Sequence, residues 1–154
     1  MIHGQAQTSR TLHAPVSLSS NSTVTGVALD TLGYDYAIIE VALATEAAVT
    51  TNPKTITLCE GAVTTAGTAI AAFTGDGASG FTIPAVCTDG TGSIVRMCVD
   101  LTKRKRYLSV QISPTTVGAL LYSVTAKLER RTHGAYSPTG PTDAELGCSE
   151  IVYG

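Results

Sequence analysis

The stretch of residues 34–44 is the sequence feature that most restricts how this chain of 154 residues can fold. Its alternate positions Ala37, Ile39, Val41 and Leu43 are all apolar. Apolar side chains with a period of two, several of them β-branched, indicate a strand with one buried face. A helix would place Ile39, Val41 and Leu43 on different faces. We therefore expect this segment to be the central strand of a β-sheet.

Similar short patterns recur along the chain, and they are separated by turns rich in Gly, Pro, Asn and Asp. The segments with strand patterns are residues 11–18, 23–29, 34–44, 55–60, 69–73, 81–85, 93–101, 107–112 and 118–130. About eight short antiparallel strands without a good helix predict an all-β fold, an antiparallel β-sandwich that is jelly-roll-like. An immunoglobulin-like sandwich is the second choice, and the absence of Trp weakens it. The residues predicted to be buried between two sheets are Ile39, Val41, Leu43, Val110, Ile112 and Val124.

The length predicts one domain, and the two ends of the chain are mostly polar. We expect an N-terminal arm over residues 1–22, a β-sandwich domain over 23–130 and an extended C-terminal tail over 131–154. Pro15 would confine a strand at 11–18 to a sheet edge. Scattered apolar residues in the two end segments are the candidate partner-binding anchors: Ile2, Leu12, Tyr136, Leu146, Ile151, Val152 and Tyr153. The alternative is that both segments fold back over their own sandwich as edge strands.

Composition restricts the possible partners. Charged residues make up 14% of the chain, against about 25% in an average domain, so we expect partners to cover part of the surface. The net charge of −2 predicts no direct binding to nucleic acid, and no apolar run approaches the ~18 residues of a membrane span. The first ten residues have no apolar segment, so we expect no signal peptide. The four cysteines lack metal-ligand spacing, and we expect them to be reduced.

No motif in the sequence gives a convincing catalytic, cofactor or metal site. Residues 75–80 match G-x-G-x-x-G, but a strand pattern follows where dinucleotide binding needs a helix. Asp76 and Asp89 lie in Gly-rich turns without further carboxylates for calcium. The histidines His3, His13 and His133 lie in arms or at a strand end, where a catalytic base lacks rigid support. We therefore expect a protein that is not an enzyme and has no cofactor.

Two segments resemble a family of structural proteins in tailed bacteriophages: DTLGYDYAIIEVAL, and VDLTKRKRYLSVQISP. The matching residues are 30–41 and 99–114, and the FTIP sequence at 81–84 also fits the family pattern. The resemblance covers roughly residues 23–130 and contains no catalytic motif. The tail has no counterpart in it, and the basic run at 103–106 is read as an exposed turn.

The resemblance implies a virion protein on the outer capsid surface, made in the host cytoplasm. Jelly-roll members of such families act as capsid decoration (cement) proteins, which are often homotrimers and clamp the major capsid protein. The alternative is a tail or fibre module that binds carbohydrate on the host surface. Aromatic residues are only 5% of the chain, which disfavours sugar stacking, but Tyr34, Tyr36, Tyr107 and Tyr122 remain candidates.

Overall fold

The computed structural model describes residues 7–18, 22–45, 55–65, 67–76, 79–83, 92–113, 120–130 and 150–153. Within these ranges the chain forms strands and one short 3-10 helix, which confirms the all-β prediction. The elements are β1 (Gln7–Leu18), β2 (Val24–Thr25), β3 (Leu29–Asp30), β4 (Tyr36–Thr45), β5 (Thr55–Gly61), β6 (Thr68–Thr74), β7 (Ser93–Asp100), η2 (Leu101–Lys103), β8 (Tyr107–Ser113), β9 (Leu120–Glu129) and β10 (Glu150–Tyr153).

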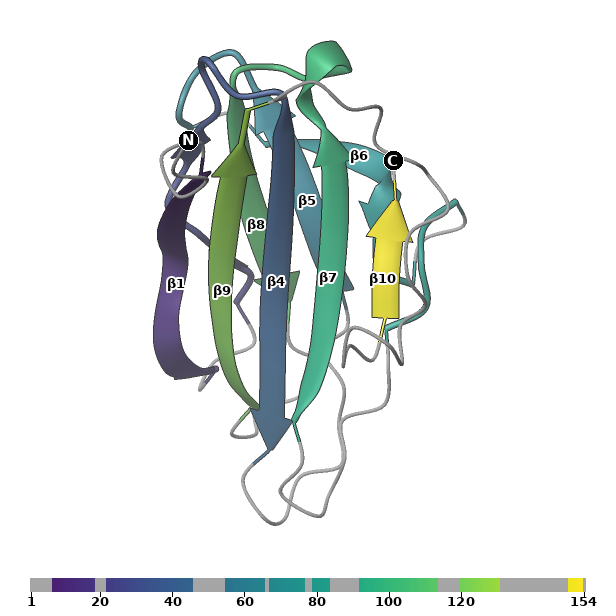
Figure 1. The fold of residues 1–154 in the computed structure, drawn as a ribbon. Coiled ribbons are helices and arrows are strands. Elements are labelled where there is room, and N and C mark those ends of the chain that lie inside the picture. Colours follow the sequence, from purple (N-terminus) through teal and green to yellow (C-terminus); the bar gives the residue numbers. More distant parts are fainter. Residues whose placement is uncertain are drawn as a thin grey trace.

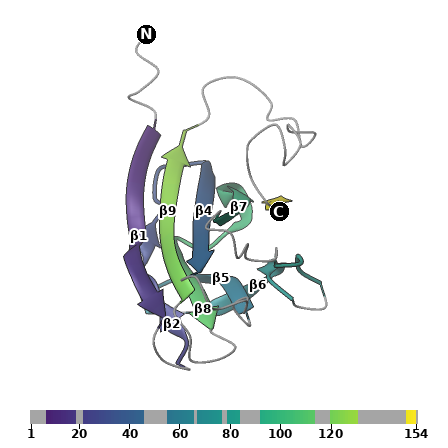
Figure 2. The same ribbon diagram turned by 90° about the horizontal axis from the view of Figure 1, so that it is seen from below.

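The strands form two sheets that pack face to face as a sandwich (Figures 1 and 2). One sheet has the order β1-β9-β4-β7-β10, and the other has the order β2-β8-β5-β6, with β3 also paired to β8. Among the described strands, all pairs are antiparallel except that of β7 and β10. The view from below shows β4 inside its row of strands and β1 at one end of that row (Figure 2).

Strand pairing is nested along the chain. The innermost pair is the hairpin of β5 and β6; outside it β4 pairs with β7, then β2 and β3 pair with β8, and finally β1 pairs with β9. The chain is therefore one long antiparallel ribbon that is folded over so that successive pairs belong to alternate sheets.

The core lies between the sheets and follows the alternation read from the sequence. On β4, Ala37, Ile39, Val41 and Leu43 are all at most 1% exposed. Neighbouring strands on both sides and the opposite sheet surround these side chains, because β4 pairs with both β7 and β9. The burial prediction is confirmed for all six residues: Ile39, Val41, Leu43, Val110, Ile112 and Val124.

The predicted strand at 23–29 is two short strands instead of one. The break falls at Gly26, whose N–H donates to the carbonyl of Val110, while the N–H of Val27 donates to the carbonyl of Leu12. A single strand over 23–29 would place Val27 and Leu29 on one side, but Val27 is 69% exposed and Leu29 is 3% exposed. The chain turns here because its backbone hydrogen bonds go to both sheets in succession.

The predicted strand at 81–85 is also wrong over residues 81–83, which belong to no strand; Phe81 and Ile83 are buried there, and Thr82 is exposed. Their hydrogen bonds go to a turn: the N–H of Asp76 donates to the Phe81 carbonyl, and the N–H of Ile83 donates to Asp76 Oδ1. Asp76 has a φ of 57°, which a tight turn requires. Residues 81–83, which follow the G-x-G-x-x-G match, are therefore not helical.

The expected N-terminal arm is in large part a strand of the domain. Residues 7–18 form the edge strand β1, and Leu12 is 3% exposed and belongs to the core. At the other edge of the same sheet, four residues of the expected tail form β10. Residues 1–6 and 131–149 lie outside the described residues.

Candidate functional site

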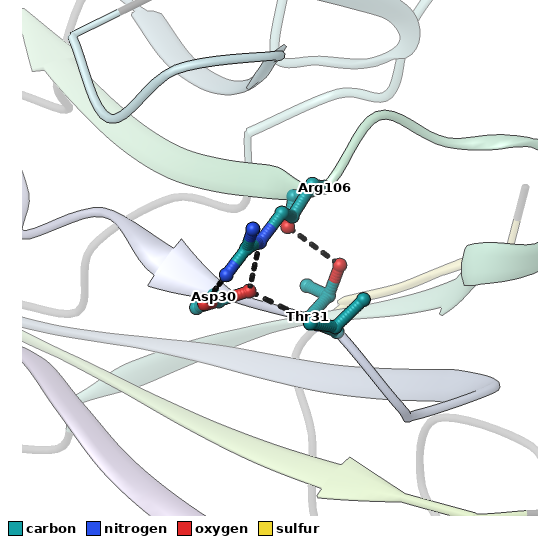
Figure 3. Close-up of polar contacts among 4 residues, drawn as sticks. Asp30, Thr31 and Arg106 are labelled. Atoms are coloured by element: carbon teal, nitrogen blue, oxygen red, sulfur yellow. Dashed lines mark hydrogen bonds and ion pairs between the residues drawn. The ribbon is translucent and has the colours of Figure 1, made fainter.

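The two long segments that carry the family resemblance meet at one end of the sandwich. Asp30 ends β3, and Arg106 directly precedes β8. The register of the two strands places Asp30 opposite Tyr107, so residues far apart in the sequence become neighbours. We call the contact between Asp30, Thr31 and Arg106 the junction (Figure 3).

An ion pair with two hydrogen bonds is the centre of the junction. Arg106 donates from Nε to Asp30 Oδ1 over 2.9 Å and from a terminal nitrogen to Oδ2 over 2.6 Å. A guanidinium held by both carboxylate oxygens has a fixed orientation. The hydrogen bonds from Arg106 and from the Leu32 N–H lower the pKa of Asp30 to about 2, and the pKa of Arg106 is raised. Both side chains are nearly half exposed, so the pair positions the two segments more than it stabilises the fold.

Thr31 adds a second connection between the same segments. Its hydroxyl and its backbone N–H both donate to the Arg106 carbonyl, over 2.7 and 2.9 Å. The Leu32 N–H donates to Asp30 Oδ1, and the Tyr34 N–H donates to the Thr31 carbonyl, which closes the turn. Gly33 has a φ of 84° in this turn, a conformation that glycine adopts without strain. Thr31 is 7% exposed, so this part of the junction is shielded from water.

The basic run at residues 103–106 is anchored in the same region. Asp100 accepts hydrogen bonds from the N–H and the hydroxyl of Thr102, which caps η2. The Lys105 N–H donates to Glu60 Oε2 over 3.2 Å. Acidic residues therefore lie beside the basic run. The run is better described as an exposed turn, as the sequence predicts, than as a uniformly basic surface.

An open depression of about 320 Å³ lies beside the junction, between β1 and the segment around β3. Its polar lining includes Thr8, Arg10, Asp30 and Tyr34. The Tyr34 hydroxyl and the Thr8 hydroxyl are 2.8 Å apart, and the Arg130 guanidinium lies 5.3 Å from the centre of the Tyr34 ring. One face of this ring is therefore already occupied by a cation.

The other tyrosines are no better placed for sugar stacking. The guanidinium of Arg106 lies 5.0 Å from the centre of the Tyr107 ring. Tyr122 is 3% exposed and belongs to the core, and Tyr36 is half-buried on β4. The structure does not bring the four candidate tyrosines together at one surface.

His13 is placed differently from the sequence expectation of a mobile arm. It lies in β1, its ring meets that of Tyr122 edge-on at 5.1 Å, and its Nδ1 is 3.2 Å from the Tyr122 hydroxyl. Its Nε2 is buried, with no hydrogen-bond partner among the described residues, and burial lowers the pKa of the imidazole. A charged His13 is thus disfavoured, and this side chain packs against its neighbours. The ring lies against Gly26, and a Cβ at that position would lie 2.8 Å from it. The glycine is the one trace of this contact in the sequence.

The predicted anchors are not brought together. Leu12 is in the core, while Ile151, Val152 and Tyr153 belong to β10, whose backbone pairs with β7. Ile2, Tyr136 and Leu146 lie outside the described residues, as do His3, Asp89 and His133. Among the cysteines, Cys59 and Cys98 lie in different sheets and are not joined to each other.

The described part of the chain shows neither a cluster of metal ligands nor a membrane-spanning helix. No group of three or more His, Cys, Asp and Glu side chains there is arranged to hold a metal ion. No helix within the described ranges has the length and apolar character needed to cross a membrane.

No protein-family model matches the sequence, and no curated protein matches it.

Proposed function

We propose that this chain is a structural virion protein that decorates a phage capsid and stabilises it by clamping neighbouring major capsid protein subunits. The observation that carries the proposal is the role of the residues behind the resemblance. Asp30, Thr31 and Arg106 hold a turn and two strands together, and the hydrophobic part of the first segment is the central strand β4. A pattern that specifies a framework suits a protein whose function is structural.

The fold supports the same proposal. We infer a jelly roll from the nested pairing of β1 with β9, β2 and β3 with β8, β4 with β7, and β5 with β6. Small jelly rolls occur in viral capsid proteins. The outward side of β4 carries the half-buried Ile38, and the chain has a low content of charged residues. Both features favour an assembly with neighbouring copies, and the proposal is a homotrimer.

The location of the protein in the virion is the decisive test. Purified particles carrying this chain are labelled with an antibody against it and imaged by electron microscopy. The proposal expects labels at regular positions over the capsid shell. Labels confined to the tail tip would reject decoration and favour the fibre alternative.

A tail deletion tests the clamp. Removal of residues 135–154 is expected to keep the cooperative unfolding of the two sheets and to lower occupancy on particles. A matched control is Val63→Ala, a change at a 58% exposed position between β5 and β6. Equal occupancy of the deletion variant and the control would reject a role for the tail in attachment.

A carbohydrate-binding module is the second candidate, and the depression beside the junction favours it. Arg10, Asp30 and the Tyr34 ring supply the polar and aromatic groups that sugars bind. Screening against a panel of bacterial surface glycans, with Tyr34→Ala as the comparison, tests this. Binding that is lost in the variant would favour the module, and the absence of binding would leave decoration as the better account.

A further inference from the structure

Among the described strands, β10 is attached to the sandwich in its own way. Its residues Glu150 to Tyr153 pair with Val95 to Cys98 of β7, and this is the parallel pair in otherwise antiparallel sheets. Four residues of parallel pairing form a weak contact, because parallel ladders are slightly less stable per residue than antiparallel ones. β10 thus covers only part of the eight-residue strand β7.

The edge of β7 is an acceptor for an added strand. β7 pairs with β4 on one side, and β10 lies on its other side. Without β10, the outer N–H and C=O groups of β7 would form an open sheet edge, which readily pairs with another chain. A strand added to such an edge gains its affinity from main-chain hydrogen bonds, so a segment of identical sequence from another copy fits equally well.

The covalent connection does not fix which copy supplies the strand. β9 and β10 run in the same direction, since β4 is antiparallel to both β9 and β7. Across the sheet, the end of β9 and the start of β10 are three strand spacings apart, or about 15 Å. Along the strand direction, the chain must also go back by about 17 Å, from the level of Asp100 to that of Val95 on β7. The 20 residues 130–149 connect them. Fully extended, they span about 70 Å, roughly three times the distance required.

We propose that the outer edge of β7 accepts the C-terminal strand of a second copy of this chain in place of the chain's own β10. The exchange creates no new type of contact, so it depends on the local concentration of the copies. A short tether holds the strand that it carries at an effective concentration on the order of 1 mM. Exchange therefore becomes extensive when copies are at least that dense, as they would be on a regular array.

A cysteine pair tests the exchange in solution. The register places Tyr153 opposite the native Cys98, so Tyr153→Cys provides a partner thiol. The other three cysteines are changed to alanine: Cys59, Cys87 and Cys148. The control is Val152→Cys in the same background, because its opposite residue is Met97. Both variants are oxidised mildly at about 10 µM and about 1 mM and run on non-reducing gels.

The proposal expects a disulfide within one chain at the lower concentration and disulfide-linked chain pairs at the higher one, in the Tyr153→Cys variant only. When the variant chain is mixed with the same variant carrying an added tag, disulfide-linked pairs of one tagged and one untagged chain should appear. Disulfides that stay within one chain at both concentrations would overturn the exchange. Failure to form any disulfide would overturn the pairing of β10 with β7 itself.

Sedimentation of chains without engineered cysteines gives a second measurement. The full chain should associate near 1 mM, and a chain that lacks residues 150–154 should associate less. Equal association of both chains would reject strand exchange as its cause. Because neither experiment uses a capsid, exchange in solution would stand even if particles showed that the protein is not a decoration protein.

Discussion

Arg106 holds Asp30 across 76 positions of sequence through two hydrogen bonds to the two oxygens of one carboxylate. The pair connects the turn before the central strand β4 to the start of β8 in the opposite sheet. The backbone carbonyl of Arg106 also accepts both hydrogen bonds from Thr31. One residue thus fixes the turn through its side chain and its main chain. A substitution at position 106 removes the ion pair of the side chain but keeps the backbone carbonyl, so it separates the two contributions.

The first prediction concerns the titration of Asp30. Its pKa is lowered to about 2 by the hydrogen bond from Arg106, so the pair favours the folded state above the ordinary pKa of 3.8. This contribution is lost as the pH falls through 3.8 towards 2. NMR titration should find a pKa near 2 in the parent chain and a value closer to 3.8 in Arg106→Ala. An unchanged value in the variant would contradict the pair.

The second prediction concerns the centre of the core. Leu43 is 1% exposed on β4, so Leu43→Ala should lower the free energy of unfolding by ~2–5 kcal/mol through lost burial and a cavity. Urea denaturation measures this change. Val63→Ala, at a 58% exposed position, is the control and should change stability by less than about 0.5 kcal/mol. A loss of that small size at Leu43 would refute its placement in the core.

The third prediction concerns the contact between Gly26 and His13. A Cβ at Gly26 would lie 2.8 Å from Cδ2 and 2.9 Å from Nε2 of a ring that Tyr122 holds in place. Gly26→Ala should therefore lower stability by ~1–3 kcal/mol, as overpacking does. The loss should shrink in a His13→Ala background. Gly67→Ala is the matched control, because it meets only the end of the Gln111 side chain.

The fourth prediction is a pH dependence at His13. Burial lowers its pKa below 6.5, so the unfolded chain binds a proton before the folded chain does. The stability contribution of the neutral ring is complete above pH 6.5 and decreases as the pH falls from there towards the folded-state pKa. The melting temperature of the parent chain should thus fall more than that of His13→Phe between pH 7 and about 5.5. Parallel curves would contradict this prediction.

The fifth prediction concerns the thiols. Burial raises the pKa of the Cys59 thiol, so little reactive thiolate is present in the folded protein. Cys59 should resist alkylation in the native chain and react fully in urea. Mass spectrometry of the denatured, unreduced chain should find four alkylated cysteines. A native disulfide between any two of them would refute the expectation that all four are reduced.

The sequence predicted the sandwich because burial in its central strands is periodic. Ile39, Val41 and Leu43 alternate with outward residues on β4, and Val110 and Ile112 do so on β8. A strand buried on one face carries this pattern in its own residues, so no neighbour is needed to recognise it. The junction was not predicted, because the pairing of Asp30 with Arg106 depends on the arrangement of β3 and β8.

Strands defined by their neighbours were harder to predict. In β1 the inward Leu12 lies among polar residues, and β1 is a strand because β9 pairs with it. β10 is likewise defined by its pairing with β7. The break at Gly26 reflects hydrogen bonds to both sheets, to Val110 and from Val27 to Leu12, which no local pattern records.

The nested ribbon has a consequence for synthesis on the ribosome. The central strand β4 needs β7 and β9 on its two sides, and β1 needs β9. A nascent chain that has not yet released residues 120–129 therefore has its central strand uncovered along one edge and its first strand without a partner. Such an intermediate is open to association with other nascent chains. The central strand β4 and the first strand β1 gain their shared partner only when β9 emerges, so these pairings form late in translation and at a rate set by long-range contacts.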